Sequence, residues 1–185
     1  MAYQLSLPLL DEHIKDAPAG ELLKKAKTQL GFIPNLYKVM ANLPELLETY
    51  RFGDTQFRQA GFTAIEQEVV YLTISTVNEC DYCMAAHSVI ATKQAHAPQD
   101  VIDAIRQGKA ISDTKLQALS SFTRLIVTQR GLVTEKDANV FLAAGFTEHH
   151  ILAVILAVGL KTMSNYTNHL ARTPIDAAFV GRKHN

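Results

Sequence analysis

The two cysteines of the chain lie in one short stretch, NECDYCMAAHS, which runs from Asn78 to Ser88. Cys80 and Cys83 have C-x-x-C spacing, and His87 follows four residues after the second cysteine. We place a helix start at Asn78, a residue type favoured at the N-cap. Residues three apart on a helix have Cβ atoms ~5–6 Å apart, so the two thiols are close enough to form a disulfide. The free N–H groups of a helix start also stabilise a thiolate, which predicts a redox-active pair.

A general base and its orienting group can be chosen from the same pattern. His87 lies one turn beyond Cys83 on the same helix face, where an imidazole can accept the thiol proton. If the helix of residues 64–77 turns back into a helix of residues 80–94, residues equidistant from the turn lie opposite one another. Glu68 and His87 are such a pair. A carboxylate there would fix the tautomer of the imidazole and stabilise the imidazolium.

The elements that position these residues are predicted to be helices. Glycines close several segments that have apolar residues at 3–4 spacing, and threonines followed by acidic residues open the next ones. The closing glycines are Gly31, Gly61, Gly108, Gly131 and Gly145, and the opening threonines are Thr63, Thr134 and Thr147. We expect helices at residues 20–30, 35–41, 44–60, 64–77, 80–94, 99–107, 113–130, 135–143 and 148–171. The β-branched run of residues 69–77 lies inside a capped segment, so the prediction is an all-α fold.

The chain of 185 residues is expected to form a single domain, residues 1–185, with residues 1–18 as an extended N-terminal arm. The sequence AGFT occurs at residues 60–63 and again at residues 144–147, and each copy leads through an apolar run to a histidine. This repeat suggests an internally duplicated helical hairpin, one copy catalytic and the other structural. Gly159, within the second apolar run, is expected to mark a close approach between backbones.

Composition narrows the classes of partner. Eighteen basic and eighteen acidic side chains give a formal net charge of zero, so we expect no nucleic-acid or membrane partner. The N-terminus lacks the pattern of a signal peptide, and the longest apolar run, Ile151–Leu160, is about half of what spans a bilayer. We therefore expect a cytoplasmic protein, in which a C-x-x-C pair is typically catalytic or metal-binding.

The pattern Glu68-x11-Cys80-x-x-Cys83-x3-His87 resembles the alkylhydroperoxidase AhpD / carboxymuconolactone decarboxylase family, most closely its peroxidase-related branch. The resemblance implies an AhpD-like helical bundle assembled as a homo-oligomer, either a trimer or a hexamer. It also implies a thiol-dependent peroxidase that needs no cofactor. In that reaction Cys83 is the peroxidatic cysteine, Cys80 is the resolving cysteine, and His87 and Glu68 relay protons. A hydroperoxide is the implied substrate, and an external dithiol, of the lipoyl type in the family, is the implied reductant.

One position departs from the family. The founding peroxidases carry a second histidine between the two cysteines, where this chain has Tyr82. A phenol with a reference pKa near ~10 is a poor base at neutral pH, but it can donate a hydrogen bond to a bound peroxide. Tyr82 is therefore predicted to bind substrate.

Two other functions remain open at this stage. A lactone enzyme of the carboxymuconolactone decarboxylase type would share the fold, although it would not require the C-x-x-C pair. A zinc-binding module could use Cys80, Cys83 and His87, but two cysteines and a histidine within one helix make an awkward tetrahedral set. The adjacent His149 and His150 point to different faces of a helix and are predicted to be structural, so no metal ligands are assigned.

Overall fold

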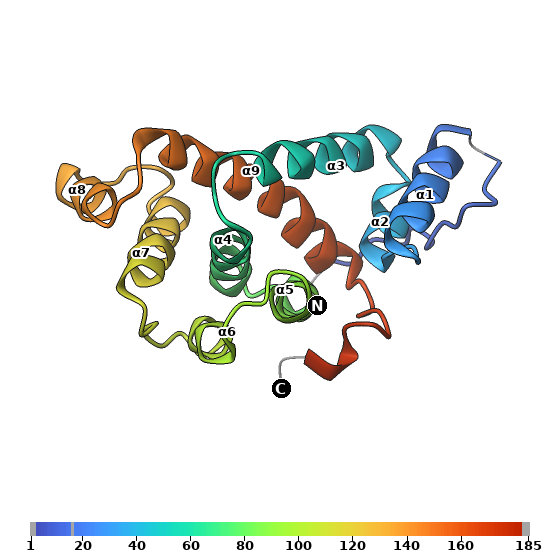
Figure 1. Cartoon of the computed structure of the whole chain (residues 1–185). Helices are drawn as coiled ribbons and strands as arrows, with labels where there is room; N and C mark the ends of the chain where they lie inside the picture. The colour runs from blue at the N-terminus through green and yellow to red at the C-terminus, as the bar shows by residue number, and fades with distance from the viewer. Residues whose placement is uncertain (1–2, 16, 183–185) are drawn as a thin grey trace.

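The computed structural model describes residues 3–15 and 17–182. These ranges contain nine α-helices, one short 3₁₀ helix and no strand, which confirms the all-α prediction (Figure 1). The elements are α1 (Ala17–Leu30), α2 (Asn35–Met40), α3 (Pro44–Arg58), α4 (Ala64–Val77), α5 (Asp81–Lys93), α6 (Gln99–Arg106), α7 (Thr114–Thr128), α8 (Glu135–Ala143), α9 (Glu148–Ala171) and η1 (Val180–Arg182).

The first described residues lie along the body of the molecule and form no helix or strand. The N–H group of Leu5 donates to the carbonyl of Leu170 at 2.8 Å, and that of Leu10 donates to the carbonyl of Lys38 at 3.2 Å. The helix that follows begins at Ala17, so the extended arm is slightly shorter than predicted. Residues 1–2 and 16 of the predicted arm lie outside the described residues.

The predicted helix boundaries rest on capping interactions that the structure contains. Thr63 and Glu66 form a capping box at the start of α4: the hydroxyl of Thr63 accepts the N–H of Glu66 at 3.2 Å, and the Glu66 carboxylate accepts the N–H of Thr63 at 2.8 Å. Thr134 forms the same arrangement with Asp137 at the start of α8. All five glycines predicted to close helices have positive φ, a backbone conformation that glycine adopts without steric cost.

Helix α4 is the centre of the fold. It packs against α5, α6, α7 and α9, and Figure 1 shows it enclosed between them. Every residue from Glu66 to Ser75 is buried. A helix surrounded in this way has no solvent-exposed face for polar residues to mark, and its polar side chains Glu66, Gln67 and Glu68 are buried with the apolar ones. This explains why its β-branched sequence has no clear helical period.

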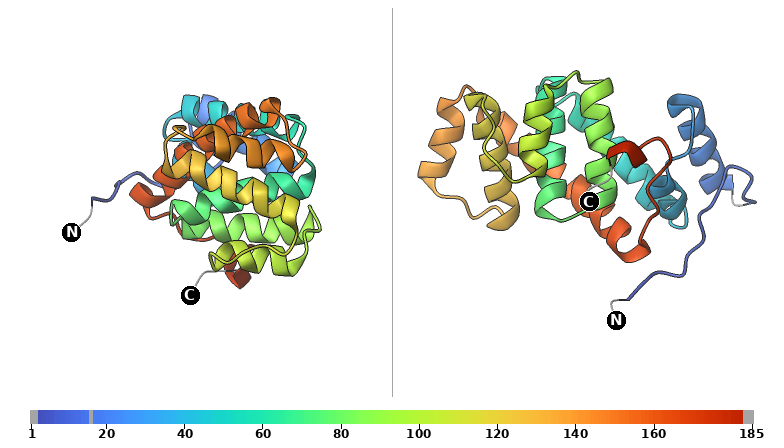
Figure 2. Two further views of the ribbon diagram at one scale, coloured as in Figure 1. Left: turned by 90° about the vertical axis from the view of Figure 1, so that its left-hand side faces the viewer. Right: turned by 90° about the horizontal axis from the view of Figure 1, so that it is seen from below.

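Helix α9 is the longest element and runs from the end of the molecule where α7 and α8 lie to the end where α2 lies (Figure 2). It crosses α3 closely at Gly53, where an added Cβ would lie 2.4 Å from Cδ2 of Leu160. The close approach expected at Gly159 is wrong, because no heavy atom lies within 4 Å of a Cβ built there. Gly159 instead lies on the exposed face of α9.

The duplicated hairpin predicted from the AGFT repeat is also wrong. After the first copy the chain forms α4, breaks at residues 78–80 and continues as α5. The break depends on Glu79, which adopts a left-handed conformation with φ of 54°. After the second copy α9 continues without interruption from Glu148 to Ala171, so that copy forms one helix and no hairpin.

Within the described ranges, no single helix is long and apolar enough to cross a membrane. Helices α8 and α9 together meet that test of length and composition only as a pair bent by 108°.

Candidate active site

The turn between α4 and α5 places the two cysteines, although not as the sequence predicted. Asn78 ends α4, where its N–H donates to the carbonyl of Ile74 at 2.9 Å, so the prediction that it caps α5 is wrong. Asparagine is favoured at turns and at both helix ends, which is why its position alone was ambiguous. Cys80 is itself the N-cap residue of α5, and Cys83 lies in the first turn of that helix.

Both cysteines are free and almost completely buried, with Cys80 1% and Cys83 2% exposed. The side-chain amide of Asn168 in α9 points at both sulfurs. Its Nδ2 lies 3.3 Å from Sγ of Cys83 and 3.8 Å from Sγ of Cys80. Oγ of Ser164, also in α9, lies 3.9 Å from Sγ of Cys83. Two polar side chains of a distant helix therefore contact Cys83.

The contact predicted between Glu68 and His87 is present. Oε2 of Glu68 lies 2.8 Å from Nδ1 of His87 across the α4–α5 hairpin. The other oxygen, Oε1, accepts a hydrogen bond from Nη1 of Arg58 in α3 at 2.7 Å. Glu68 and His87 are almost completely buried, Arg58 is half-buried, and the ring of Tyr71 packs against the imidazole with centroids 4.8 Å apart. Glu68 and Tyr71 thus hold the imidazole in place.

This arrangement fixes the charge of the carboxylate and the tautomer of the histidine. Burial raises the pKa of Glu68, but the interactions with His87 and Arg58 lower it by more than burial raises it. The pKa of Glu68 therefore lies below its ordinary value. A carboxylate at Nδ1 favours the proton on that nitrogen. Nε2 of His87 is therefore the basic nitrogen, and it can accept a proton from Cys83 one turn away.

The pKa values of the two thiols are shifted in opposite directions. Burial raises the pKa of Cys83, but the thiol hydrogen bond from Cys80 and the positive charges of Lys161 and His87 lower it well below the ordinary value. The pKa of Cys80 is raised, first because its proton is donated to Cys83 and then because it is buried. These two shifts favour Cys83 as the thiolate and Cys80 as the neutral thiol that donates a hydrogen bond to it.

A cavity of about 490 Å³ opens onto Cys83 and His87. Its walls come from α1–α3, α5, α9 and the C-terminal segment, and they are largely apolar. The apolar and aromatic lining residues include Leu30, Phe32, Leu36, Tyr37, Tyr50, Ile90 and Phe179. Such a cavity suits a small molecule with an apolar body.

Tyr82 lines this cavity, but its hydroxyl is already engaged. It donates a hydrogen bond to Oδ2 of Asp176 and accepts one from the N–H of Leu36 at 3.3 Å. The same carboxylate accepts the N–H of Asn35, which ties the segment after α9 to α2. Burial and the bond to Asp176 raise the pKa of Tyr82, so it stays neutral. Its predicted role in binding peroxide stays a prediction, and in this structure it joins two walls of the cavity.

The histidines outside this cavity have other surroundings. Nδ1 of His150 accepts the N–H of Thr147 at 3.1 Å at the start of α9. His169 is exposed and stacks on Tyr166. Within the described part of the chain, no group of three or more His, Cys, Asp or Glu side chains is placed to hold a metal ion.

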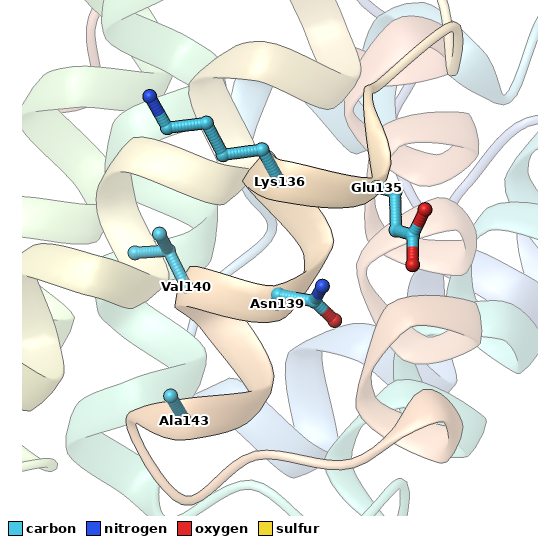
Figure 3. Close-up of a pocket in the computed structure, with 5 residues that line it drawn as sticks. All are labelled: Glu135, Lys136, Asn139, Val140 and Ala143. Carbon is cyan, nitrogen blue, oxygen red and sulfur yellow. The ribbon is translucent and has the colours of Figure 1, made fainter.

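A second hollow lies on the outer face of α8 (Figure 3). All of its lining residues belong to that one helix: Glu135, Lys136, Asn139, Val140 and Ala143. It contains neither a thiol nor an imidazole. A hollow bounded by one helix positions no second group against a ligand, so we assign no chemistry to it.

Sequence reasoning missed the residues that α9 contributes to the site: Lys161, Ser164, Asn165 and Asn168. They lie about 80 residues after the cysteines in sequence. Their spacing of three and four residues places them on one helix face, which was the only available signal. Nothing local indicated which element that face contacts.

Part of the chain is similar to a known family. Residues 41–124, which include Glu68, both cysteines and His87, match the carboxymuconolactone decarboxylase family. The resemblance to this family and the AhpD-like, all-α fold predicted from the sequence are therefore confirmed. No curated protein matches the sequence of the chain.

Solved structures share the AhpD-like fold at low sequence identity. The AhpD-core, peroxidase-related protein of Ralstonia eutropha JMP134 is 19% identical with a TM-score of 0.83, over 94% of this chain and 93% of that one. A peroxidase-related protein of Silicibacter sp. TM1040 is 20% identical with a TM-score of 0.80, over 97% and 95%. The debrominase Bmp8, solved with 2,3,4-tribromopyrrole, is 16% identical with a TM-score of 0.75, over 97% of each chain. At these identities the likeness establishes the fold.

Proposed function

We propose that the protein is a thiol-dependent peroxidase that reduces a small hydroperoxide through Cys83 and Cys80. One observation carries the proposal: the buried Cys83 lies between Cys80, the N-cap residue of α5, and His87, one turn further along the same helix. Nδ1 of His87 lies 2.8 Å from the buried carboxylate of Glu68. That arrangement combines a nucleophile, a resolving thiol and a base. The adjoining apolar cavity offers room for an organic hydroperoxide.

The proposed cycle has three steps that balance. The Cys83 thiolate attacks the O–O bond of the hydroperoxide ROOH, forming Cys83 sulfenic acid and releasing RO⁻, which takes a proton from the imidazolium of His87 and leaves as ROH. The Cys80 sulfur then displaces hydroxide from the sulfenic acid, giving the disulfide and water. An external dithiol reduces the disulfide by two electrons and restores both thiols.

The reductant, the compartment and the assembly complete the proposal. A lipoyl-type dithiol would regenerate the pair, and a reducing compartment such as the cytoplasm would keep it reduced. We also propose that the subunits associate with one another as a trimer or hexamer. The exposed face of α9 carries apolar side chains along its length, namely Leu152, Ile155, Leu156, Tyr166 and Leu170. With a net charge of zero, little electrostatic repulsion opposes contact between copies.

Intact mass with thiol alkylation tests the redox pair. The reduced protein is treated with one equivalent of cumene hydroperoxide, and its thiols are then alkylated under denaturing conditions. We expect loss of two hydrogens, protection of both cysteines, and recovery of both thiols with dihydrolipoamide. Two thiols that remain free and unreactive would contradict the proposal, as would a bound zinc ion in native mass spectra.

Two variants assign the roles of the cysteines. Cys83→Ser should abolish oxidation, whereas Cys80→Ser should react once and stop at the sulfenic or sulfinic acid. The reverse pattern would exchange the roles. Because Bmp8 is a debrominase, 2,3,4-tribromopyrrole is a useful second oxidant. Oxidation by the bromopyrrole without oxidation by hydroperoxides would retain the dithiol and reject the peroxide as substrate.

A further inference from the structure

Helix α9 contains an unusual group of buried polar atoms beside the cysteines. Five buried side-chain polar atoms of the described residues make no hydrogen bond, and three of them belong to this helix: Nζ of Lys161, Nδ2 of Asn165 and Oδ1 of Asn168. Buried polar groups nearly always have partners. Of the three, only Lys161 can carry a charge.

Burying the Lys161 ammonium has a large energetic cost. The residue is 0% exposed, and no carboxylate of the described residues forms a salt bridge with it. Its Nζ lies 5.2 Å from the ring centroid of Tyr71, a cation–π contact that offsets only part of the cost of burial. Removing an ion from water remains costly even after the surroundings relax. A nearby negative charge would offset this cost.

The nearby carboxylates are already neutralised by other groups. Glu68 is bound by Arg58 and His87. Asp54 accepts the hydroxyl of Tyr71 at 2.8 Å and lies 3.7 Å from Nε of Arg58. This leaves the phenols and the thiols as groups that could supply a negative charge to Lys161.

The phenols around the cavity do not supply that charge. Three tyrosines that line the cavity, Tyr37, Tyr50 and Tyr82, have raised pKa values, in each case first because of burial. Burial is also the first cause of the raised pKa of Tyr71, whose ring faces Lys161.

The pKa of Cys80 is also raised. Lys161 and Cys83 line the same cavity, and Ser164 and Asn168, which follow Lys161 on one face of α9, contact the Cys83 sulfur. Among the phenols and thiols only Cys83 also has a lowered pKa, and the charge of Lys161 is one of the causes.

We propose that Lys161 is the buried counter-charge that holds Cys83 as a thiolate. Lys161 acts through Cys83 and is therefore a positioning residue. Its role in peroxide turnover rests on the proposed function, but its effect on Cys83 does not. The residue lies outside residues 41–124, the segment that matches the family.

The principal test measures thiolate formation without peroxide. Reduced protein is alkylated with iodoacetamide from about pH 4 to pH 10, and modification of Cys83 is followed by mass spectrometry. The midpoint is the pH at which alkylation of Cys83 reaches half of its maximal rate. In Lys161→Met, which keeps an unbranched side chain of similar length without the charge, this midpoint should rise by about 1–3 pH units. Lys161→Arg should keep most of the wild-type midpoint. Thr123→Val, which removes another buried unpartnered atom from α7, is the control and should not change it.

The fraction of disulfide at redox equilibrium is a second measurement. A purely structural role of Lys161 would not predict that its loss increases this fraction. Stabilising the thiolate favours the reduced form of a dithiol pair. At a fixed ratio of oxidised to reduced dithiothreitol, Lys161→Met should therefore contain a larger fraction of disulfide than wild type. An unchanged alkylation midpoint in folded Lys161→Met would overturn the proposal, whether or not the protein turns over peroxide. A shifted midpoint without peroxide turnover would retain it and reject only the proposed function.

A further measurement applies if Lys161→Met fails to fold. The ¹⁵N resonance of Nζ of Lys161 is compared between reduced wild type and Cys83→Ser at pH 7. Removing the thiolate should change this resonance, because the ammonium loses its counter-charge. Identical resonances would overturn the proposal.

Discussion

Two stretches of the chain begin with the same four residues and build different structures. After the AGFT of residues 60–63, helix α4 stops at Val77 and the chain turns into α5. After the AGFT of residues 144–147, α9 continues for 24 residues. The first stretch therefore has a second helix start, and Cys80 and Cys83 lie at it. The second stretch presents an unbroken face that covers those sulfurs with Asn168 and Ser164.

The comparison separates two requirements of a reactive thiol. The break in the first stretch supplies the nucleophile, the resolving thiol and the base within one hairpin. The continuous helix of the second stretch supplies an enclosing wall with hydrogen-bond donors and a positive charge. Neither stretch alone makes the site, so variants in each should have effects of different kinds.

The largest effect is expected for His87 in the first stretch. His87→Ala removes the base, and loss of a general base costs about 10²–10⁴-fold in rate. We expect that decrease in the rate of Cys83 oxidation by cumene hydroperoxide at pH 7, measured by stopped flow. His169→Ala is the matched control, because the histidine that ends the second stretch is exposed and stacks on Tyr166. Equal losses in the two variants would contradict the assignment of His87.

A smaller effect is expected for the amide of α9 that points at the sulfurs. Asn168→Ala removes the donor 3.3 Å from Sγ of Cys83. A hydrogen bond to a charged group contributes about 1.5–3 kcal/mol, so the oxidation rate should fall about 10- to 100-fold. Thr167→Ala serves as control, since that hydroxyl donates to the carbonyl of Met163 within the same helix. A rate as high as wild type in Asn168→Ala would exclude this amide from the reaction.

The crossing of α3 and α9 should affect stability. Gly53→Ala places a Cβ against the buried side chain of Leu160, and overpacking of this kind costs about 1–3 kcal/mol. Gly159→Ala, at an open position of the same long helix, should stabilise the monomer by about 0.5–1 kcal/mol, because alanine is the better helix former. Urea unfolding measures both. Similar free energies of unfolding for the two variants would contradict the close approach at Gly53.

The smallest effect is expected at the break itself. Glu79 has φ of 54°, a conformation that costs a non-glycine residue about 1–2 kcal/mol. Glu79→Gly should relieve part of this cost and raise the free energy of unfolding by up to about 1 kcal/mol. Arg130, after the end of α7, has the same φ of 54°. Arg130→Gly therefore shows the change in the free energy of unfolding expected from relieving this conformation far from the cysteines. A clear loss of stability in Glu79→Gly alone would mean that its side chain supports the turn.

Local sequence was sufficient for one half of the site and insufficient for the other. The pairing of Glu68 with His87 followed from their equal distance to one turn, and the capped helix starts followed from Thr63 and Thr134. The contribution of α9 could not be predicted, because Lys161 and Asn168 reach Cys83 only through tertiary packing. The prediction for Asn78 was wrong because asparagine suits either end of a helix. The duplicated hairpin was wrong because a four-residue match says nothing about where the following helix ends.

The length of α9 has a consequence for how the protein should be studied. A helix of 24 residues is about 36 Å long, and both of its faces extend over that length. Its inner face carries Lys161, Ser164 and Asn168, and its outer face carries the exposed apolar side chains from Leu152 to Leu170. A second copy bound to the outer face would therefore also fix the groups around Cys83. Thiol reactivity would then vary with protein concentration, and dilution below the dissociation constant of the assembly would change the chemistry without any change in sequence.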